Sequence, residues 1–349
     1  MRIEQLIRSH LLKFEPYRSA RSEVRDARIF LDANELSSGS PVEVDGISLH
    51  RYPDPSQTAL RGKIAEQLSL SPERIFVGVG SDEIIDLLIR LFCNPSKDSV
   101  GIFEPTYGVY RVAATVNDVE AVSLPLNECF HIDAEQSRGA ASSSTKIIFC
   151  CSPNNPTGNL LDRNDILKLC RDLDTIVVVD QAYIEFADAG GDLSNDVLRN
   201  DNLVVLRTFS KAWGLAGIRL GYCIAHPAIV SYLLRIKAPY NINAVTSKLA
   251  LEALKKKEFL VSSSENVVEQ RNRLAAGLKR IAGVIRVYPS DANFLLVEVQ
   301  HAARLYERLA NDGIIVRRRS EPRLANCLRL TVGTQEENDL LLHSLSKNL

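Results

Sequence analysis

The chain has 349 residues, of which 45% are hydrophobic and 24% are charged. These proportions are typical of a globular protein with a sizeable core, and they exclude disorder for most of the chain. The 42 Lys and Arg residues and the 43 Asp and Glu residues give a net charge of −1. Without a basic excess, nucleic acid is not an expected partner. At about 150 residues per domain, this length predicts two domains.

The N-terminal segment and the cysteines indicate the cellular compartment in which the protein is expected. Five apolar residues recur at helical spacing, which predicts a docking helix: Ile3, Leu6, Ile7, Leu11 and Phe14. The charged residues Arg2, Glu4 and Arg8 within this apolar pattern argue against a secretory leader. No stretch approaches the ~18 apolar residues of a membrane span. The seven cysteines lack paired metal-ligand spacing, so no metal site is expected. We therefore expect a cytoplasmic protein with free thiols and no membrane partner.

From residue 58 to residue 208, helical patterns alternate with short strand patterns. The strand patterns are continuous apolar or β-branched runs, which are typical of a mostly parallel sheet with helices on both faces. The expected helices cover Thr58–Leu70, Ser81–Cys93 and Asp162–Leu173, and the expected strands cover Ile75–Val79, Ser99–Phe103, Lys146–Cys151, Thr175–Asp180 and Leu203–Thr208.

The pattern changes near residue 244, which indicates a second, smaller α+β domain. The expected helices there are 244–258, 265–282, 301–312 and one from Gln335 onward, and the expected strands are Val284–Tyr288, Asn293–Val299, Ile314–Arg317 and Leu328–Thr331. We therefore expect an N-terminal arm (1–30) that docks with the small domain, a large domain (31–243) and a small domain (244–349).

A glycine-containing turn, GVGSDE at residues 78–83, joins a predicted strand to the helix that follows it. The free N–H groups in the first turn of a helix can hold a phosphate without a basic residue. Alternatively, the turn is only a tight connection in which Asp82 and Glu83 complement the helix dipole. The turn lacks the third glycine of a dinucleotide fingerprint, which argues against NAD.

Two further polar segments directly follow strands of the predicted sheet. The turn SPNNPTG occupies residues 152–158, and Asp180 ends the next strand. Open α/β sheets bind ligands at the carboxyl ends of their strands, so Asn155 can donate to a ligand oxygen and Asp180 can pair with a buried cation. Tyr183 reaches the same site if the chain turns. The alternatives are a plain connecting turn and an Asp that caps the next helix.

The segment Leu203–Tyr222 places Lys211 just after a buried strand and before a run of small residues. A lysine in this position is ordinarily a solvated surface charge. Its small and apolar neighbours instead favour an amine that approaches a flat ligand, loses its proton and attacks an aldehyde. Ser210 and Arg219 supply further donors for a phosphate.

One ligand, pyridoxal 5′-phosphate, accounts for these four segments and their order. Together, the segments supply four kinds of contact: donors to the phosphate, a partner for the ring nitrogen, donors to the ring oxygen, and an amine for a Schiff base with the aldehyde. The candidates at the phosphate are Ser81, Asp82, Ser210 and Arg219, and the candidate partner of the ring nitrogen is Asp180. Asn155 and Tyr183 are the candidates at the ring oxygen, and Lys211 is the candidate for the Schiff base.

The chain resembles fold-type I pyridoxal-phosphate aminotransferases over nearly its whole length, and among them the histidinol-phosphate aminotransferase family. The NPTG turn and the lysine segment are common to many aminotransferases. The other matching pieces are LDANE at 31–35, RYPDP at 51–55, EPTYGVY at 104–110 and CLRLTVGT at 327–334. Two residues depart from the family pattern: Leu36 stands where Asn-Pro is usual, and Gln181 stands where an acidic residue is common.

The resemblance implies an α/β fold of type I with Lys211, Asp180 and Tyr183 as catalytic residues. Lys211 would form the Schiff base and move the proton from the substrate carbon to the cofactor, while Asp180 keeps the ring nitrogen protonated. Tyr107 would stack on the cofactor ring. Tyr52 would reach the cofactor phosphate of a neighbouring subunit, which implies a homodimer; otherwise the RYPDP segment is an isolated proline turn.

The implied reaction is amino transfer between histidinol phosphate and 2-oxoglutarate or glutamate, in histidine biosynthesis. Arg317 and Arg329 would bind the phosphate ester and the carboxylates. Tyr17, Tyr52 and Asn34 would line the substrate pocket. From the residues alone, the run 317–319 is also readily explained as a solvated charge cluster. Arg329 is more informative, because a charge among apolar strand residues needs a partner or a ligand.

Three other functions remain open. The first is an aminotransferase for aromatic amino acids, since a pocket for imidazole also accepts a phenyl ring. The second is a lyase on the same scaffold, such as a threonine-phosphate decarboxylase, which needs the same cofactor residues and a phosphate pocket. The third is a regulator with an aminotransferase-like domain, which would need a DNA-binding module that this composition does not favour.

Overall fold

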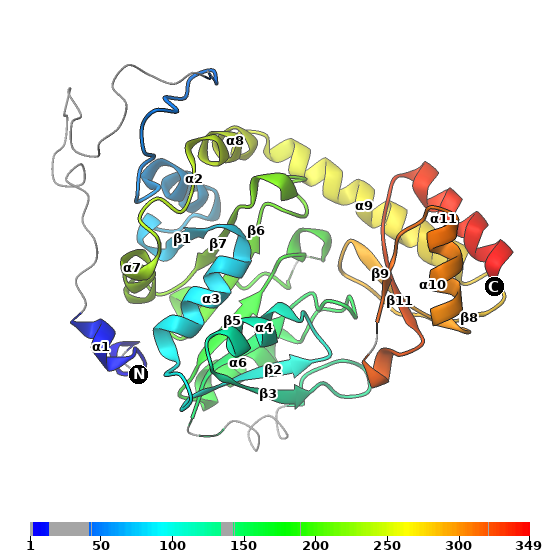
Figure 1. Ribbon diagram of the computed structural model, residues 1–349, viewed down its shortest axis with the longest axis horizontal. Coiled ribbons are helices and arrows are strands. Elements are labelled where there is room, and N and C mark those ends of the chain that lie inside the picture. Colours follow the sequence, from blue (N-terminus) through cyan, green and yellow to red (C-terminus); the bar gives the residue numbers. More distant parts are fainter. Residues whose placement is uncertain are drawn as a thin grey trace.

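A computed structural model describes residues 3–13, 42, 44–133, 142, 144–188, 190–319 and 321–349. Their strands form two sheets, and the long helix α9 (Lys257–Leu278) leads from the side of the larger sheet to the smaller one (Figure 1). The larger sheet has the order β1-β7-β6-β5-β4-β2-β3. Its strands are β1 (Ile75–Gly78), β2 (Ser99–Glu104), β3 (Glu120–Pro125), β4 (Thr145–Cys151), β5 (Ile176–Asp180), β6 (Leu203–Thr208) and β7 (Gly221–Ile224).

The larger sheet is mostly parallel, as the sequence predicts. Strands β3, β2, β4, β5 and β6 pair in parallel, whereas β7 is antiparallel to both β6 and β1. The two strands that lack a clear sequence signal are β3 and β7. Strand β3 lies at the edge and is largely exposed, and β7 has only four residues, so neither carries a long apolar run.

The side chains of the central strands alternate between two apolar clusters. In β5, Val177 and Val179 pack on one side and Ile176 and Val178 on the other, and all of them are buried. This alternation is the two-residue period of a strand, and burial on both faces requires the continuous apolar runs seen in the sequence. Helices α2 (Thr58–Leu68), α6 (Arg163–Asp172) and α8 (Ala244–Leu254) cover the first face, and α3 (Gly80–Phe92), α4 (Val109–Val116) and α7 (Pro227–Ile236) cover the second.

The N-terminal residues pack beside the larger sheet. They form a 3₁₀ turn, η1 (Ile3–Gln5), and the short helix α1 (Ser9–Leu12) instead of one continuous docking helix. Ile3 and Ile7 are buried in the cluster that contains α3 and α7, and the Arg8 N–H donates to the Leu91 carbonyl at 3.1 Å. The described residues of the arm pack beside α3 and α7 of the larger sheet, and the docking of the arm (1–30) with the small domain stays a prediction. Phe14 and the rest of the arm lie outside the described residues.

The smaller sheet has the order β10-β11-β9-β8. Its elements are β8 (Val284–Val287), β9 (Phe294–Val299), α10 (Ala302–Asn311), β10 (Arg317–Arg318), β11 (Cys327–Thr331) and α11 (Gln335–Asn348). Strand β10 has only two residues and lies later than the expected strand Ile314–Arg317. Ala250 and Leu254 of α8 are buried in the core of the larger sheet. The limits of the two domains stay a prediction, and residue 244 precedes a helix that packs with the larger sheet.

Within the described parts of the chain, no helix combines the length and the apolar content needed to cross a membrane. The same residues contain no group of three or more His, Cys, Asp or Glu side chains placed to hold a metal ion.

Candidate active site

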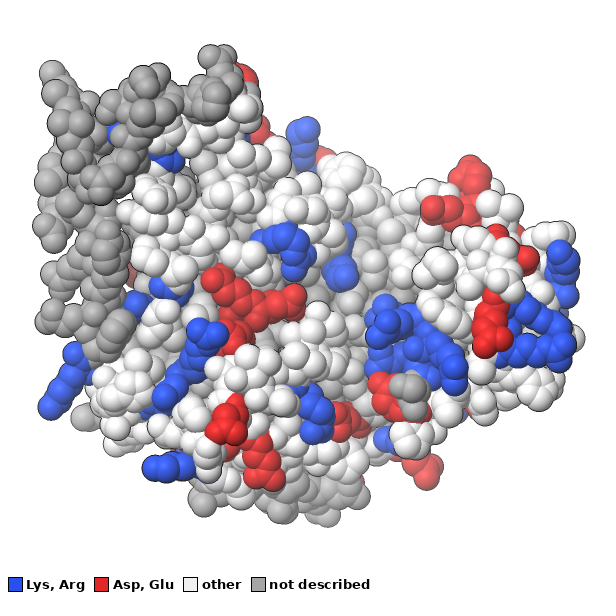
Figure 2. Space-filling view, viewed as in Figure 1, with Lys and Arg blue, Asp and Glu red and all other residues white. Residues whose placement is uncertain are grey.

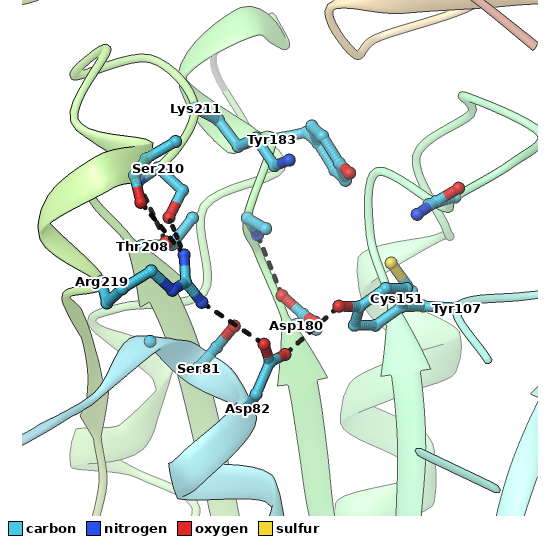
Figure 3. Close-up of a pocket in the computed structure, with 14 residues that line it drawn as sticks. Ser81, Asp82, Tyr107, Cys151, Asp180, Tyr183, Thr208, Ser210, Lys211 and Arg219 are labelled. Carbon is cyan, nitrogen blue, oxygen red and sulfur yellow. Dashed lines mark hydrogen bonds and ion pairs between the residues drawn. The ribbon is translucent and has the colours of Figure 1, made fainter. Parts of the chain in front are cut away.

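A cavity of about 150 Å³ opens where β4, β5 and β6 end and α3 begins (Figure 3). Its wall brings together the cofactor-site residues that the sequence predicts within one subunit. These are Ser81, Asp82, Tyr107, Asn155, Asp180, Tyr183, Ser210, Lys211 and Arg219. The wall also contains Gly80, Cys151, Ala182, Thr208 and Ala216, which the sequence motifs do not single out.

Three neighbouring strands each end with a residue of the cavity wall. These residues are Cys151 in β4, Asp180 in β5 and Thr208 in β6. The residue two positions before each of them faces the cluster beneath α3 and α4, so all three point to the same side of the sheet. In the strand register, Cys151 lies opposite Asp180. The cavity therefore follows from parallel strands that end at one edge.

Asp180 is the buried carboxylate of the site. Its Oδ1 accepts a hydrogen bond from the Ala182 N–H at 3.1 Å, and its Oδ2 accepts one from the Tyr110 hydroxyl at 2.8 Å. Burial raises the pKa of Asp180 to about 6, and these two hydrogen bonds oppose that rise by stabilising the charged form. Asp180 is therefore suited to pair with a cationic group that enters the cavity.

Lys211 lies at the open mouth of the cavity and is exposed, with its amine pointing inward (Figure 3). Desolvation by the surrounding protein is the largest effect and lowers the pKa of its ammonium group. The positive charge of Arg329 lowers this pKa further. A lower pKa increases the fraction of neutral amine, which is the form that attacks an aldehyde. Its Nζ lies 5.6 Å from the centre of the Tyr183 ring. Tyr183 itself is buried and meets the Phe294 ring edge-on.

Hydrogen-bond donors gather at the other end of the cavity, around the start of α3. Arg219 Nη1 donates to the Ser210 hydroxyl at 3.4 Å, and its Nη2 lies 3.5 Å from Asp82 Oδ2. The Tyr107 hydroxyl donates to the other oxygen of Asp82 at 3.2 Å. With the N–H groups of the first helical turn, Ser210 and Arg219 form a cradle for an anion. Arg219 also offsets the negative charge of Asp82.

The cradle depends on a glycine at position 80. Gly80 has a φ of +72°, and a Cβ there would come within 2.8 Å of Arg219 Nη2. Both the backbone conformation and the space next to Arg219 therefore exclude a side chain. The glycine lets the start of α3 approach the guanidinium closely.

Arg329 joins the smaller sheet to the cavity. It lies on β11, and its Nη1 donates to Asn155 Oδ1 at 2.6 Å. Burial, and the nearby charges of Arg319 and Arg317, lower its pKa. Arg329 contacts the wall residue Asn155 but is not itself part of the cavity wall. Arg317 lies opposite Arg329 in the strand register, is exposed, and is not part of the wall either. Figure 2 shows Lys and Arg side chains gathered on this face in the region of β10 and β11.

The other predicted residues lie away from this cavity or outside the described structure. Tyr52 is half exposed, does not line the cavity, and stacks on Tyr240 with ring centres 4.5 Å apart. Tyr17 and Asn34 lie outside the described residues, as does the LDANE segment that contains Leu36. The roles assigned to Tyr52, Tyr17 and Asn34 therefore stay predictions.

Gln181, which departs from the family pattern, is fully buried and has a defined set of partners. Its Nε2 donates to the Gly191 carbonyl at 2.6 Å, and its Oε1 accepts from the Leu193 N–H at 3.2 Å. An amide serves both partners, because it has a donor and an acceptor. Gln181 thus anchors the segment that follows Tyr183 and does not contact the cavity.

The residues present fit pyridoxal phosphate. An amine with a lowered pKa, a buried carboxylate, an aromatic side chain and an anion cradle that only a glycine permits lie around one cavity. These four kinds of group match the four parts of pyridoxal phosphate. The amine matches the aldehyde, the carboxylate the ring nitrogen, the aromatic side chain the flat ring, and the anion cradle the phosphate.

Comparisons with known proteins agree with pyridoxal phosphate as the cofactor. The model of the family "Aminotransferase class I and II" matches residues 26–345. The histidinol-phosphate aminotransferase of Parabacteroides distasonis is 45% identical over 99% of both chains, and that of Bacteroides thetaiotaomicron is 43% identical over 99% of this chain and 98% of its own. The structure of the Sinorhizobium meliloti histidinol-phosphate aminotransferase in complex with pyridoxal-5′-phosphate has a TM-score of 0.79 at 25% identity, and covers 86% of this chain and 83% of its own.

A solved structure with a different activity is also similar. It is L-threonine-O-3-phosphate decarboxylase from Porphyromonas gingivalis, with a TM-score of 0.74 and 26% identity. The match covers 86% of this chain and 90% of that chain. The fold is therefore similar to that of both a transferase and a decarboxylase.

Proposed function

Because the chain belongs to the class I and II aminotransferase family and uses pyridoxal phosphate, we propose that it transfers an amino group between histidinol phosphate and 2-oxoglutarate or glutamate. This reaction would serve histidine biosynthesis. The observation that carries the proposal is the near-complete coverage of histidinol-phosphate aminotransferases at 39–45% identity. The shared position of Lys211, Asp180 and Asn155 around one cavity supports it.

Bound pyridoxal phosphate supplies an aldehyde that takes up the amino group and a ring that stabilises negative charge at the substrate carbon. Asp180 pairs with the ring nitrogen and favours its protonated form. Lys211 would hold the cofactor through its Nζ, and the same nitrogen would carry the proton to be transferred. Tyr107 packs against the ring.

Asn155 and Tyr183 are the donors that we assign to the ring oxygen. Because Asn155 Oδ1 accepts from Arg329, the Nδ2 of this amide is the group left to donate into the cavity. Ser81, Asp82, Ser210 and Arg219 form the phosphate end. Their backbone and side-chain donors hold the cofactor in one orientation.

Arg329 is the substrate anchor that we favour within this chain. It is half-buried, and its planar fork matches both a carboxylate and a phosphate ester. Arg317 is exposed on the neighbouring strand and would help Arg329 to bind the anionic group of the substrate. Tyr17 and Asn34 would complete the substrate pocket.

We also propose a homodimer in the cytoplasm, in which Tyr52 reaches the phosphate end of the partner subunit's cavity. Tyr52 lies outside its own cavity and stacks on Tyr240, so its phenol lies on the outside of this chain. Because about half of the Tyr52 side-chain surface is exposed, a second subunit can pack against it.

A decarboxylase acting on threonine phosphate is the second candidate, favoured by the similarity to the Porphyromonas gingivalis enzyme. One experiment separates the two candidates and the aromatic aminotransferase. Histidinol phosphate, phenylalanine and threonine phosphate are each supplied to the holoenzyme with 2-oxoglutarate, and glutamate and CO₂ are measured separately. The proposal expects glutamate formation to be most efficient with histidinol phosphate. CO₂ release from threonine phosphate without glutamate would contradict it.

A further inference from the structure

Tyr110 lies in the first turn of α4 and does not line the cavity. Its side chain is fully buried, and its ring stacks on Phe149 of β4 with centres 4.8 Å apart and an angle of 5° between the planes. It meets the Tyr107 ring edge-on at 5.6 Å. The hydroxyl donates to Asp180 Oδ2 at 2.8 Å. The ring is thus held from two sides, while the hydroxyl reaches the carboxylate of the site.

Packing alone does not explain the hydroxyl of Tyr110. A phenylalanine would fill the same space and make the same ring contacts with Phe149 and Tyr107. A buried hydroxyl without a partner is costly, so its presence points to the hydrogen bond with Asp180. Because an ionised carboxylate only accepts hydrogen bonds, this donor stabilises the charged form of Asp180.

We propose that Tyr110 is a positioning residue for amino transfer: its hydroxyl orients the Asp180 carboxylate and keeps it ionised for pairing with the cofactor ring nitrogen. The inference rests on the proposed function for its link to turnover, but the contact with Asp180 exists in the chain itself. Tyr110 acts through Asp180 and not on the substrate.

The need for such a donor follows from the surroundings of Asp180. Burial already brings the pKa of this carboxyl to about 6, close to neutral pH. A protonated carboxyl cannot form an ion pair with a cationic ring, so a further rise would remove the partner of the ring nitrogen. The other titratable groups that act on Asp180 come from several elements: Asp82 of α3, Tyr107 before α4, Cys151 of β4, Tyr183 after β5 and Lys211 after β6.

These other groups do not replace the hydroxyl. The charge of Asp82 raises the pKa of Asp180, and that of Lys211 lowers it, but burial outweighs both. Among the side chains that the structure describes, Tyr110 makes the hydrogen bond to Asp180 that the geometry shows; the other donor is the Ala182 backbone. The protonation state of Asp180 is therefore most easily changed by removing one oxygen atom from Tyr110.

The test is Tyr110→Phe in the full-length chain, with carbon-13 NMR of labelled Asp side chains as the main readout. The Asp180 signal is identified by its loss in Asp180→Asn. We expect the pKa of Asp180 to rise by about one to two units, the amount that corresponds to a hydrogen bond to a charged group. Tyr288→Phe is the control, because its hydroxyl lies 3.4 Å from Glu298, away from the cavity. An unchanged Asp180 titration in Tyr110→Phe would overturn the proposal.

A second readout uses the holoenzyme. In Tyr110→Phe the acidic limb of the kcat profile should move to higher pH by the same amount as the NMR titration, while KM for the amino donor changes by less than about twofold. A purely structural role would lower kcat equally at every pH, and that result would refute the inference. If the wild-type chain turns over no histidinol phosphate while the NMR shift is present, the proposed function fails and the contact between Tyr110 and Asp180 stands.

A measurement on the unaltered chain guards against a variant that does not fold. The Cζ carbon of Tyr110, labelled with carbon-13, should titrate with the same midpoint as the Asp180 carboxyl, because the two groups share one proton-donor bond. A Tyr110 signal that stays constant through the Asp180 transition would contradict the proposal without any substitution.

Discussion

Arg329 on β11 donates to Asn155 in the turn after β4, so one hydrogen bond of 2.6 Å connects the two sheets at the cavity. A second connection lies beside it, where the Asp291 N–H donates to the Gly158 carbonyl at 2.7 Å. The Nε of Arg329 is buried without a hydrogen-bond partner in the described structure. Its Nη1 is thus held beside the cavity by Asn155, which lines the cavity wall.

Replacing Arg329 by alanine should raise KM for histidinol phosphate and for 2-oxoglutarate, each by about 10- to 100-fold, because one guanidinium would serve both anions. Arg318→Ala on the exposed neighbouring strand is the matched control and should leave both values nearly unchanged. Steady-state kinetics with each substrate varied separately check the prediction. If only one KM rises, the two substrates use different anchors.

Replacing Lys211 by alanine should leave a folded protein that has lost at least about 10²–10⁴-fold in kcat, the usual contribution of a positioned proton carrier. Borohydride treatment of the holoenzyme followed by peptide mass mapping should place the reduced cofactor on residue 211 in the wild-type chain only. Circular dichroism checks that the variant folds. Normal turnover by Lys211→Ala would exclude the assigned role.

The affinity of the apoprotein for pyridoxal phosphate should fall as the pH decreases through about 6, because Asp180 is then protonated and cannot pair with the ring nitrogen. The stability of the apoprotein depends on pH in the opposite direction to its affinity for the cofactor. The folded apoprotein binds this proton more tightly than the unfolded chain, so the contribution of Asp180 to stability decreases as the pH rises from about 4 to about 6.

Asp180→Asn is the matched variant for both effects. It should flatten the pH dependence of cofactor binding and of the apoprotein melting temperature over that interval, and lower kcat by roughly 100-fold or more. Fluorescence titration and thermal denaturation across the pH range measure the two effects. A variant that keeps the wild-type pH dependence would assign the transition to another group.

Gly80→Ala should weaken cofactor binding and destabilise the protein by about 1–2 kcal/mol, because alanine is strained at positive φ and its methyl group would press on Arg219. Gly62→Ala is the control, since position 62 lies inside α2 with open space around it. That substitution should stabilise the protein by about 0.5–1 kcal/mol. Equal effects of the two substitutions on cofactor affinity would argue against the cradle.

Mixing two inactive variants tests the shared active site. If Tyr52 serves the partner subunit, a mixed dimer of Lys211→Ala and Tyr52→Ala subunits contains one intact site, because both substitutions fall in the other site. Co-expression with two different affinity tags isolates this dimer, and we expect it to have about half the activity of the wild-type dimer. Activity no higher than that of the two parent variants would place Tyr52 in its own subunit's site.

Much of the site could be predicted because its residues lie next to strong local signals. Asp180 and Lys211 each follow a buried apolar strand, and parallel strands bring such residues to one edge. The contact between Tyr110 and Asp180 had no such signal, because it joins a helix and a strand 70 residues apart, and a tyrosine in an amphipathic helix is also explained by core packing. Likewise, the two-residue strand β10 and the packing of Ile3 and Ile7 depend on tertiary contacts that a local pattern does not contain.

The alternation of side chains in β5 also limits how this part of the chain can change in length. Asp180 points toward Tyr110 because it lies two positions after Val178 and four after Ile176, and both of these side chains face the same layer. Deleting one residue between positions 176 and 179 would turn the carboxylate toward α6 and bury it among aliphatic side chains. Insertions and deletions within this strand should therefore be eliminated, whatever the identity of the residue gained or lost.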